Sequence, residues 1–586
     1  MKKYNFIKLI FIVFATLNIS CSMELEIEDT FDEDYAYGLP ENTEGLLLNA
    51  YGNLPNTIID TYGGDFSDAA TDNAVTNNYG NGMYRLGSGG LTPNNNPIGQ
   101  WDNAYNQLRN IHMFFENGLG DNVIYDITSE SEDQLKRDNL KGEAFYLRAW
   151  WSFHLLQAYG GKTVSGEALG YPIVLKTLSD SEAEDFESVK RDTYEDCVAQ
   201  IIKDIDSSIV YLPFKYSGSN PTTGINNLGR ADQQVALALK SRVSLYAASP
   251  AYQNDNVVSL TGMGQFAVVD EAKYIDKWKT AAMYAQDAIN QIGDFTSLSE
   301  SHFASNTTPS EFIWRSFFTN SNLENANYPI AEFGSARTGP SQNLVNAFYT
   351  KNGYPITDSR SGYDANNPYE NRDPRLYLNV LFNGSSFNNR YLETYEGGLD
   401  SREAYTNNSR TGYYVRKWLS LQPGLISVDN SSSSRHYNPY FRRTELYLNL
   451  AEAANEAFGP NDIGPGVAQS AVSIIKSIRS KAGITDNTYV DEVAALGKDE
   501  FRKLIQNERR LELAFENHRY FDLRRNLLPL DETVKGIKIT QNNDFTLNYE
   551  EVDVEERKFT SIKYYYTPLP YDELSQNPNL INNIGW

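Results

Sequence analysis

Apolar residues recur every three or four positions through several long stretches of the chain, as expected for helices that bury one face. The clearest stripe joins Val198, Ile201 and Ile205, with the charged Lys203 off the stripe. On this basis helices are predicted over residues 134–159, 194–212, 231–248, 276–292, 442–458, 467–482 and 499–515. Antiparallel helices of this length stack so that each pair covers the apolar face of its neighbour. The pattern therefore predicts a mainly α fold built from stacked helix pairs.

Two stretches, residues 54–97 and 297–438, lack this periodicity and are dense in Asn, Gly, Ser and Tyr. These residues favour turns and local side-chain hydrogen bonds over regular structure. A few short strands are expected among them, for example over residues 413–419, with Trp418 on that strand. Long loops carried on a rigid scaffold are where binding residues tend to lie. We therefore expect an irregular, loop-rich lobe that holds the functional site.

The first residues indicate export. Three lysines precede an apolar run over residues 9–17, which is too short to cross a bilayer but fits a signal peptide. The small Ser20 directly before Cys21 resembles a bacterial lipobox, although Asn18 departs from the usual apolar residue. We therefore predict a lipoprotein signal peptide over 1–20, acyl chains on Cys21 and a solvated acidic tether over 21–40. An ordinary secreted protein cleaved elsewhere is the alternative.

Composition excludes some classes of function. The 586 residues include 76 acidic and 51 basic side chains, giving a net charge of −25. A general nucleic-acid binder needs a basic face, so no nucleic-acid partner is expected. The two cysteines, Cys21 and Cys197, cannot form a disulfide framework, and Cys197 on its predicted helix is expected to be a buried, inert thiol. The 40 tyrosines suit wet contact surfaces as well as cores.

Six sequence blocks, in order along the chain, resemble the SusD/RagB family of outer-membrane nutrient-uptake lipoproteins. They are Lys141–Trp150 followed by Tyr159-Gly160-Gly161, Gly229-Arg230 with Ala238–Tyr246, Arg443–Ala453, Ile478–Gly483, Glu508–Arg525 and Tyr566–Trp586. Two departures are small: Asn517 stands where the family usually has Gly after Glu516, and Trp586 replaces the commoner Tyr.

This resemblance implies a SusD-like fold, with tetratricopeptide-like helix pairs as the scaffold and an irregular lobe with short strands. It divides the chain into an N-terminal helical region over 41–310 and a C-terminal SusD/RagB region over 311–586, forming one compact unit. It also implies a surface-exposed outer-membrane lipoprotein that binds oligosaccharide or polysaccharide and delivers it, without catalysis, to a SusC-like TonB-dependent transporter. Capture of peptides or another nutrient in the same complex is the alternative, and a surface glycoside hydrolase is a third.

The family tends to place ligand contacts in the loops after the first helix and in the central lobe, here residues 65–84 and 314–395. A sugar offers a flat C–H face for aromatic rings and a rim of hydroxyl groups for Asn, Asp and Arg side chains. The residues predicted to contact the glycan are Asp68, Asp72, Asn73, Tyr79, Tyr84, Trp314, Tyr328, Arg372 and Tyr395.

No catalytic constellation is evident, because the five histidines are isolated in sequence and no nucleophile, phosphate-loop or metalloprotease motif occurs. Glu508, Glu512 and Glu516 share one helix face, and pairing with Arg509, Arg510 and Arg519 would make them structural; a glycosidase-like carboxylate pair is the alternative. Asp65, Asp68 and Asp72 fit either a solvated turn or cap, or a ligand-facing cluster. No cofactor or metal is predicted, although oxygen-rich loops would permit a structural Ca²⁺.

Overall fold

The computed structural model describes residues 33–55, 65–185, 189–256, 267–268, 271–320, 322–420, 422–430 and 433–586. The predicted signal peptide, the lipidation site Cys21 and most of the predicted tether lie outside the described residues. The last part of the tether range is helical, which corrects that prediction: α2 spans Glu33–Gly38, and α3 (Pro40–Gly52) starts at Pro40. Proline suits the first position of a helix because its fixed backbone angle is already helical.

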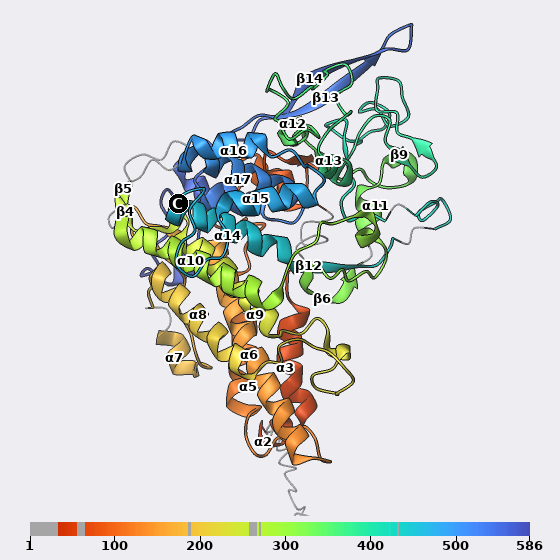
Figure 1. Ribbon diagram of the computed structural model, residues 1–586. Coiled ribbons are helices and arrows are strands. Elements are labelled where there is room, and N and C mark those ends of the chain that lie inside the picture. The colour runs from red at the N-terminus through yellow and green to blue at the C-terminus, as the bar shows by residue number, and fades with distance from the viewer. Residues whose placement is uncertain are drawn as a thin grey trace, which may run out of the picture.

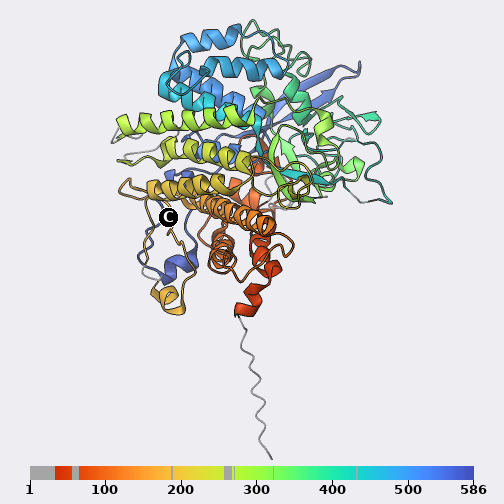
Figure 2. The same cartoon turned by 60° about the horizontal axis from the view of Figure 1, so that its bottom comes forward.

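Stacked helices form most of the molecule (Figures 1 and 2). The long members are α5 (Trp101–Asn117), α6 (Glu130–Tyr159), α8 (Tyr194–Tyr211), α9 (Gln233–Ala248), α10 (Glu271–Ile292), α14 (Arg443–Phe458), α15 (Ala471–Lys481) and α17 (Lys498–Glu512). Each helix contacts the next in the order α3, α5, α6, α8, α9, α10 and α14, and both α15 and α17 pack on α14. With 45% helix against 11% strand, the mainly α prediction is confirmed.

Local sequence sets where these helices begin. The side chains of Ser129, Thr193 and Asp232 accept hydrogen bonds from backbone N–H groups in the first turns of α6, α8 and α9, respectively. Such caps satisfy donors that the helix itself leaves unpaired. All seven predicted helices are present. On α8, Cys197 is fully buried, and burial raises the pKa of its thiol to about 12, as expected for an inert cysteine.

A loop-rich lobe lies beside the stack and has its own apolar core, centred on residues such as Leu344, Phe348 and Tyr413. Among the described residues every sheet has two strands. The strands are β1 (Ala74–Thr76), β2 (Gly161–Lys162), β3 (Ala168–Leu169), β4 (Asp255–Asn256), β5 (Ala267–Val268), β6 (Phe312–Asn320), β7 (Thr338–Pro340), β8 (Val380–Leu381), β9 (Ser386–Phe387), β10 (Arg390–Tyr391), β11 (Tyr414–Val415), β12 (His436–Arg442), β13 (Val534–Gln541) and β14 (Leu547–Glu555).

The predicted strand over residues 413–419 is wrong beyond the two residues of β11. Trp418 sits in a turn with φ of 70°, and its indole N–H donates to the Phe515 carbonyl. That left-handed conformation is incompatible with a strand. The remaining helices are short: α4 (Gly82–Gly87), α7 (Asp180–Asp185), α11 (Leu323–Asn327), α12 (Gln342–Ala347), α13 (Pro374–Asn379), α16 (Thr488–Ala495), α18 (Arg519–Arg525) and α19 (Tyr571–Gln576).

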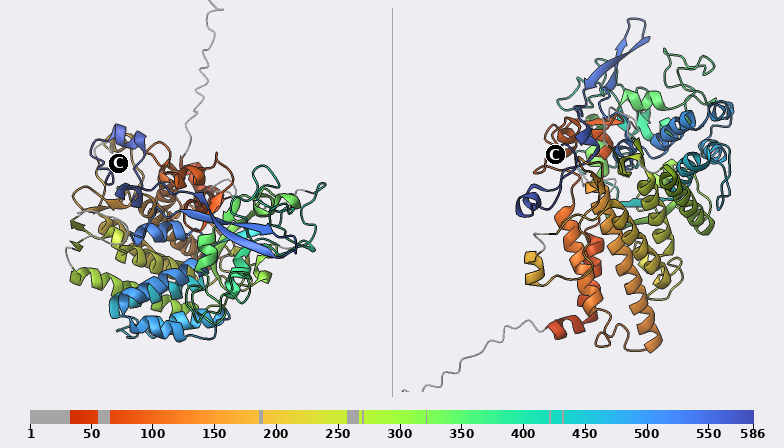
Figure 3. Two further views of the ribbon diagram at one scale, coloured as in Figure 1. Left: turned by 90° about the horizontal axis from the view of Figure 1, so that it is seen from above. Right: turned by 90° about the vertical axis from the view of Figure 1, so that its left-hand side faces the viewer.

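Two strand pairs tie distant parts of the chain together. Antiparallel pairing of β1 with β7 places residues 74–76 against residues 338–340, and β6 pairs with β12 beside the helix stack. The longest hairpin, β13–β14, projects from the top of the molecule (Figures 1 and 3). The lobe is therefore built from segments at both ends of the chain, and its loops are held from several sides.

Candidate functional site

Six of the nine predicted ligand contacts are buried in the fold. At most 5% of the surface of each is exposed: Asp68, Asp72, Asn73, Trp314, Tyr328 and Arg372. A ring must be open to cover a sugar face, and a polar group must be free to bond its hydroxyls. These six side chains therefore serve the fold, and the predicted contacts reduce to Tyr79, Tyr84 and Tyr395.

The acidic cluster after α3, formed by Asp65, Asp68 and Asp72, is buried and bonded to distant parts of the chain. The Arg519 guanidinium donates to both oxygens of Asp72 at 2.9 and 2.7 Å, and Arg510 lies 3.0 Å from the same carboxylate. Burial alone would raise the pKa of Asp72, but the two arginines hold it well below its usual range. Asn73 accepts from Arg510 and donates to Asp68. The cluster is thus neither a solvated turn nor ligand-facing: it joins this segment to the region around α18.

The other three buried side chains also form hydrogen bonds within the fold. Trp314, on β6, donates from its indole N–H to the Gly229 carbonyl at 2.8 Å. The Tyr328 hydroxyl donates to the Ser420 carbonyl, and the Arg372 guanidinium donates to three backbone carbonyls within the lobe at 2.6–2.8 Å. Buried polar groups of this kind stabilise loops that lack regular backbone pairing.

Tyr79 is the most open of the predicted contacts, with 55% of its surface exposed. Its ring meets that of Tyr84 edge to face, with centroids 4.9 Å apart. The Arg410 guanidinium lies 5.0 Å from the Tyr79 centroid and is held in turn by Glu555 at 2.5 Å. Tyr395 is half-buried against the lobe's core. The structure thus presents the Tyr79 ring on a fixed support.

Three further aromatic residues, two on neighbouring loops and one at the end of β10, are exposed and were not predicted. Phe333 is 51% exposed, Tyr391 71% and Tyr405 36%. We call Tyr79, Phe333, Tyr391 and Tyr405 together the aromatic loop surface. Nothing in the local sequence separates these rings from the many aromatic residues of the core. Only the positive φ of 64° at Phe333, seen in the structure, marks its position as unusual.

Hydrogen bonds connect the loops that carry this surface. The Asn77 amide donates to the carbonyl oxygens of Ser335 at 2.7 Å and Asn407 at 2.5 Å, which links the loops of Tyr79, Phe333 and Tyr405. Arg390, beside Tyr391, donates to Glu332, beside Phe333, at 2.5 Å. The four rings are therefore presented by one cross-linked set of loops.

Asp65, close to β1, is expected to make the stability of the protein depend on pH. Its side chain accepts from the Thr338 hydroxyl at 2.9 Å, and burial raises its pKa to about 7. When the pKa of a carboxyl is higher in the folded state than in the unfolded chain, the free energy of unfolding falls as pH rises through the interval between the two pKa values. Asn at this position cannot ionise. We therefore expect the free energy of unfolding of Asp65→Asn to rise by about 2 kcal/mol relative to that of the wild type between pH 5 and pH 8. Denaturant unfolding at the two pH values measures this; an equal difference at both would contradict it.

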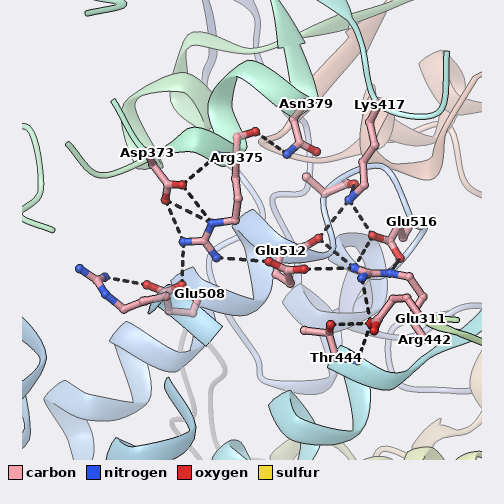
Figure 4. Close-up of polar contacts among 12 residues, drawn as sticks. Glu311, Asp373, Arg375, Asn379, Lys417, Arg442, Thr444, Glu508, Glu512 and Glu516 are labelled. Atoms are coloured by element: carbon pink, nitrogen blue, oxygen red, sulfur yellow. Dashed lines mark hydrogen bonds and ion pairs between the residues drawn. The ribbon is translucent and has the colours of Figure 1, made fainter. Parts of the chain in front are cut away.

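Glu508, Glu512 and Glu516 form a buried network at the end of α17 (Figure 4). Their contacts are Glu508 with Arg375 at 2.9 Å and Arg479 at 2.7 Å, Glu512 with Arg375 at 3.4 Å and Arg442 at 3.5 Å, and Glu516 with Arg442 at 2.7 Å and Lys417 at 2.6 Å. The structural interpretation of these glutamates is thus favoured.

The predicted partners of these glutamates are wrong. Arg509 pairs with Asp522 at 2.9 Å, while Arg510 and Arg519 pair with Asp72. The reason is geometric: side chains one or two positions apart on a helix point in different directions, so Arg509 and Arg510 face away from Glu508.

The network does not suit glycoside hydrolysis. Burial would raise the pKa of Glu516, but Arg442 and Lys417 lower it to about 2. A glycosidase general acid needs a raised pKa, and both carboxyl groups must reach the scissile bond. Glu508 is fully buried, so it cannot do so.

Within the described ranges, no three His, Cys, Asp or Glu side chains come together in a way that could hold a metal ion. None of the helices in this part of the chain has both the length and the apolar content to cross a membrane.

Two family models match the chain. One, described as the SusD family, covers residues 300–586, and the other, described as starch-binding associating with outer membrane, covers residues 47–245. The chain belongs to the SusD family. SusD-like protein P25 of Formosa agariphila is 21% identical over 603 residues, covering 100% of this chain and 98% of the relative. SusD-like protein P38 of the same organism is 24% identical over 535 residues, covering 89% and 92%.

Solved structures show the same fold. A SusD-like protein of Bacteroides fragilis NCTC 9343 matches with a TM-score of 0.70 at 22% identity, over 94% of this chain and 98% of that one. A SusD-like carbohydrate binding protein of the same organism matches with a TM-score of 0.67 at 19% identity, over 93% and 99%. The predicted SusD-like fold is confirmed. The departure at Asn517 is also explained: its φ is 60°, a conformation that asparagine tolerates better than most residues other than glycine.

Proposed function

We propose that this SusD-family protein is a surface-exposed lipoprotein of the outer membrane, anchored through acyl chains on Cys21. It captures oligosaccharides and delivers them, without altering them, to a SusC-like TonB-dependent transporter. Supporting this proposal, one matching family is described as starch-binding and associating with the outer membrane, and a structural neighbour is described as carbohydrate binding.

The observation that carries the proposal is the aromatic loop surface. Exposed rings on cross-linked loops suit the flat C–H face of a sugar, and they lose little conformational freedom when a ligand binds. The exposed amide of Asn407 and the half-buried amide of Asn78 lie in the same loops and can pair with hydroxyl groups. The ligand-contact role of Tyr79, Tyr84 and Tyr395 is part of this proposal.

Calorimetric titration of the purified protein with a panel of oligosaccharides and of peptides tests the ligand class. Heat of binding with oligosaccharides alone supports the proposal, whereas binding of peptides alone would favour the second kind of cargo. Analysis of the sugars after several hours adds an independent check, because newly formed reducing ends would show hydrolysis and overturn the non-catalytic role.

Tyr79→Ala is expected to raise the Kd for a bound oligosaccharide roughly fivefold to tenfold, because a ring contact worth about 1–1.5 kcal/mol is lost. Titration of wild type and variant measures this change. Tyr571→Ala is the matched control, since Tyr571 is 54% exposed against 55% for Tyr79 but lies on α19. Equal Kd values for the wild type and Tyr79→Ala would remove this ring from the site.

A further inference from the structure

The β13–β14 hairpin has a supported inner strand and an open outer one. Ile537 and Ile539 on β13 are buried in the lobe's core, and Thr411 and Glu396 bond to the β13 backbone. Strand β14 pairs with β13 from Leu547 to Glu555 and with no other strand among the described residues. The hairpin projects beyond the body in two views (Figures 1 and 3).

The tip of the hairpin is braced by its own side chains. The Asn542 N–H donates to the Thr546 carbonyl at 2.8 Å, and the Phe545 N–H donates to the Asn542 carbonyl at 2.9 Å. One oxygen of Asp544 accepts from both the backbone and the hydroxyl of Thr546, at 3.1 and 2.6 Å. The tip is thus a defined turn, and it sets the direction in which Phe545 points.

The backbone conformation and the exposure of Phe545 do not favour the stability of the folded chain. Its φ is 68°, a left-handed conformation that glycine adopts without strain and phenylalanine does not. The ring is 79% exposed, so this strain is not offset by apolar burial within the chain. A strained, exposed aromatic residue on a rigid turn points to a contact outside the molecule.

The charges along the hairpin indicate which kind of partner surface it could meet. Exposed Glu550 and Asp553 lie on β14, and exposed Glu556 follows it directly. Two lysines of β13 face this strand: Lys535 lies 3.2 Å from Glu551, and Lys538 is opposite Glu550 in register and pairs with Glu396 at 3.1 Å, so acidic groups remain in excess. Exposed acidic side chains on an open strand oppose the addition of another strand. The tip, rather than the strand edge, is therefore the binding feature, and its partner needs basic groups.

We infer that Phe545 is a docking anchor: it enters an apolar pocket on a partner protein, and basic side chains around that pocket face the acids of β14. Taking the transporter as this partner rests on the proposed function. The base of the hairpin also reaches the aromatic loop surface, because Arg410 bonds Glu555 and the Val554 carbonyl while its guanidinium lies over Tyr79. The docking element and the candidate ligand site thus share one arginine.

The test uses the full-length tagged protein, produced together with the SusC-like transporter that the proposed function assigns to it. With Phe545→Gly, recovery of the transporter with the tagged protein should fall tenfold or more. The oligosaccharide Kd should stay unchanged, and the thermal unfolding midpoint should stay equal or rise, because glycine relieves the strained φ. Phe545→Tyr, which keeps the ring, should restore recovery. Unchanged recovery with Phe545→Gly would overturn the inference.

A second arm separates this inference from the proposed function. A photo-crosslinker placed at position 545 in intact cells should give one dominant protein adduct, while the same group at Leu496, 71% exposed at the end of α16, should not. An adduct with a protein other than the transporter keeps the docking role and removes the proposed partner. Equal labelling from both positions, or none from 545, would overturn the docking role, whatever sugar the protein binds.

Discussion

Replacing Arg442 with methionine is expected to lower the free energy of unfolding by about 3–5 kcal/mol, because several carboxylates then lose a buried cation. The Arg442 side chain is 2% exposed, and it lies 3.3 Å from Glu311, 3.5 Å from Glu512 and 2.7 Å from Glu516. Figure 4 shows these acids converging on its guanidinium. Urea unfolding followed by circular dichroism measures the loss.

Arg360→Met is the matched control. Arg360 also pairs with two acids, Asp358 at 2.8 Å and Glu492 at 2.7 Å, but its side chain is 50% exposed. Water screens such a pair, so its loss should lower the free energy of unfolding far less than the loss of Arg442. Arg442→Lys keeps the charge but not the planar guanidinium, so its loss of unfolding free energy should lie between those of Arg442→Met and Arg360→Met. A cost for Arg442→Met no larger than that for Arg360→Met would contradict this account.

The second large effect is expected for Trp150→Ala, which should lower the free energy of unfolding by about 3–5 kcal/mol. This fully buried ring on α6 packs edge to face on Trp314 of β6, with centroids 4.8 Å apart, and on Tyr440 and Phe441 of β12, at 5.6 and 5.7 Å. It therefore joins the helix stack to the β6–β12 pair. Loss of the ring leaves a cavity at this junction, and thermal or urea unfolding measures the cost.

Trp150→Phe separates packing from hydrogen bonding. The Trp150 indole N–H has no hydrogen-bond partner among the described residues, so phenylalanine removes volume but no bond. We expect Trp150→Phe to lower the free energy of unfolding clearly less than Trp150→Ala does. If Phe and Ala were equally costly, the edge-to-face packing described here would not be the source of stability.

The helices were predictable because their signal is local. An apolar stripe of period 3.6 depends on neighbours three and four positions away, so each stretch carries its own evidence. The β13–β14 hairpin was missed although Ile537, Lys538 and Ile539 alternate apolar and polar, which is the pattern of a strand with one face buried. That short alternation was the available signal.

The candidate site could not be predicted in the same way. Asp72 sits in a polar, loop-forming stretch, yet it is buried because Arg519, 447 positions away, reaches it. Glu508 likewise takes Arg375 from 133 positions away. Local sequence predicts that such residues need partners, but only the folded chain decides which ones. The same limit applies to Tyr79, because the strand just before it, β1, pairs with β7 from a distant part of the chain.

The pairing of Asp72 with Arg510 and Arg519 also constrains how such chains can diverge. The carboxylate belongs to the segment matched by one family model and both arginines to the segment matched by the other. Loss of the acid alone would leave two buried cations without their partner, and loss of the arginines alone would leave a buried acid without its cations. A change on one side of this pairing is therefore expected to be tolerated only with a matching change on the other.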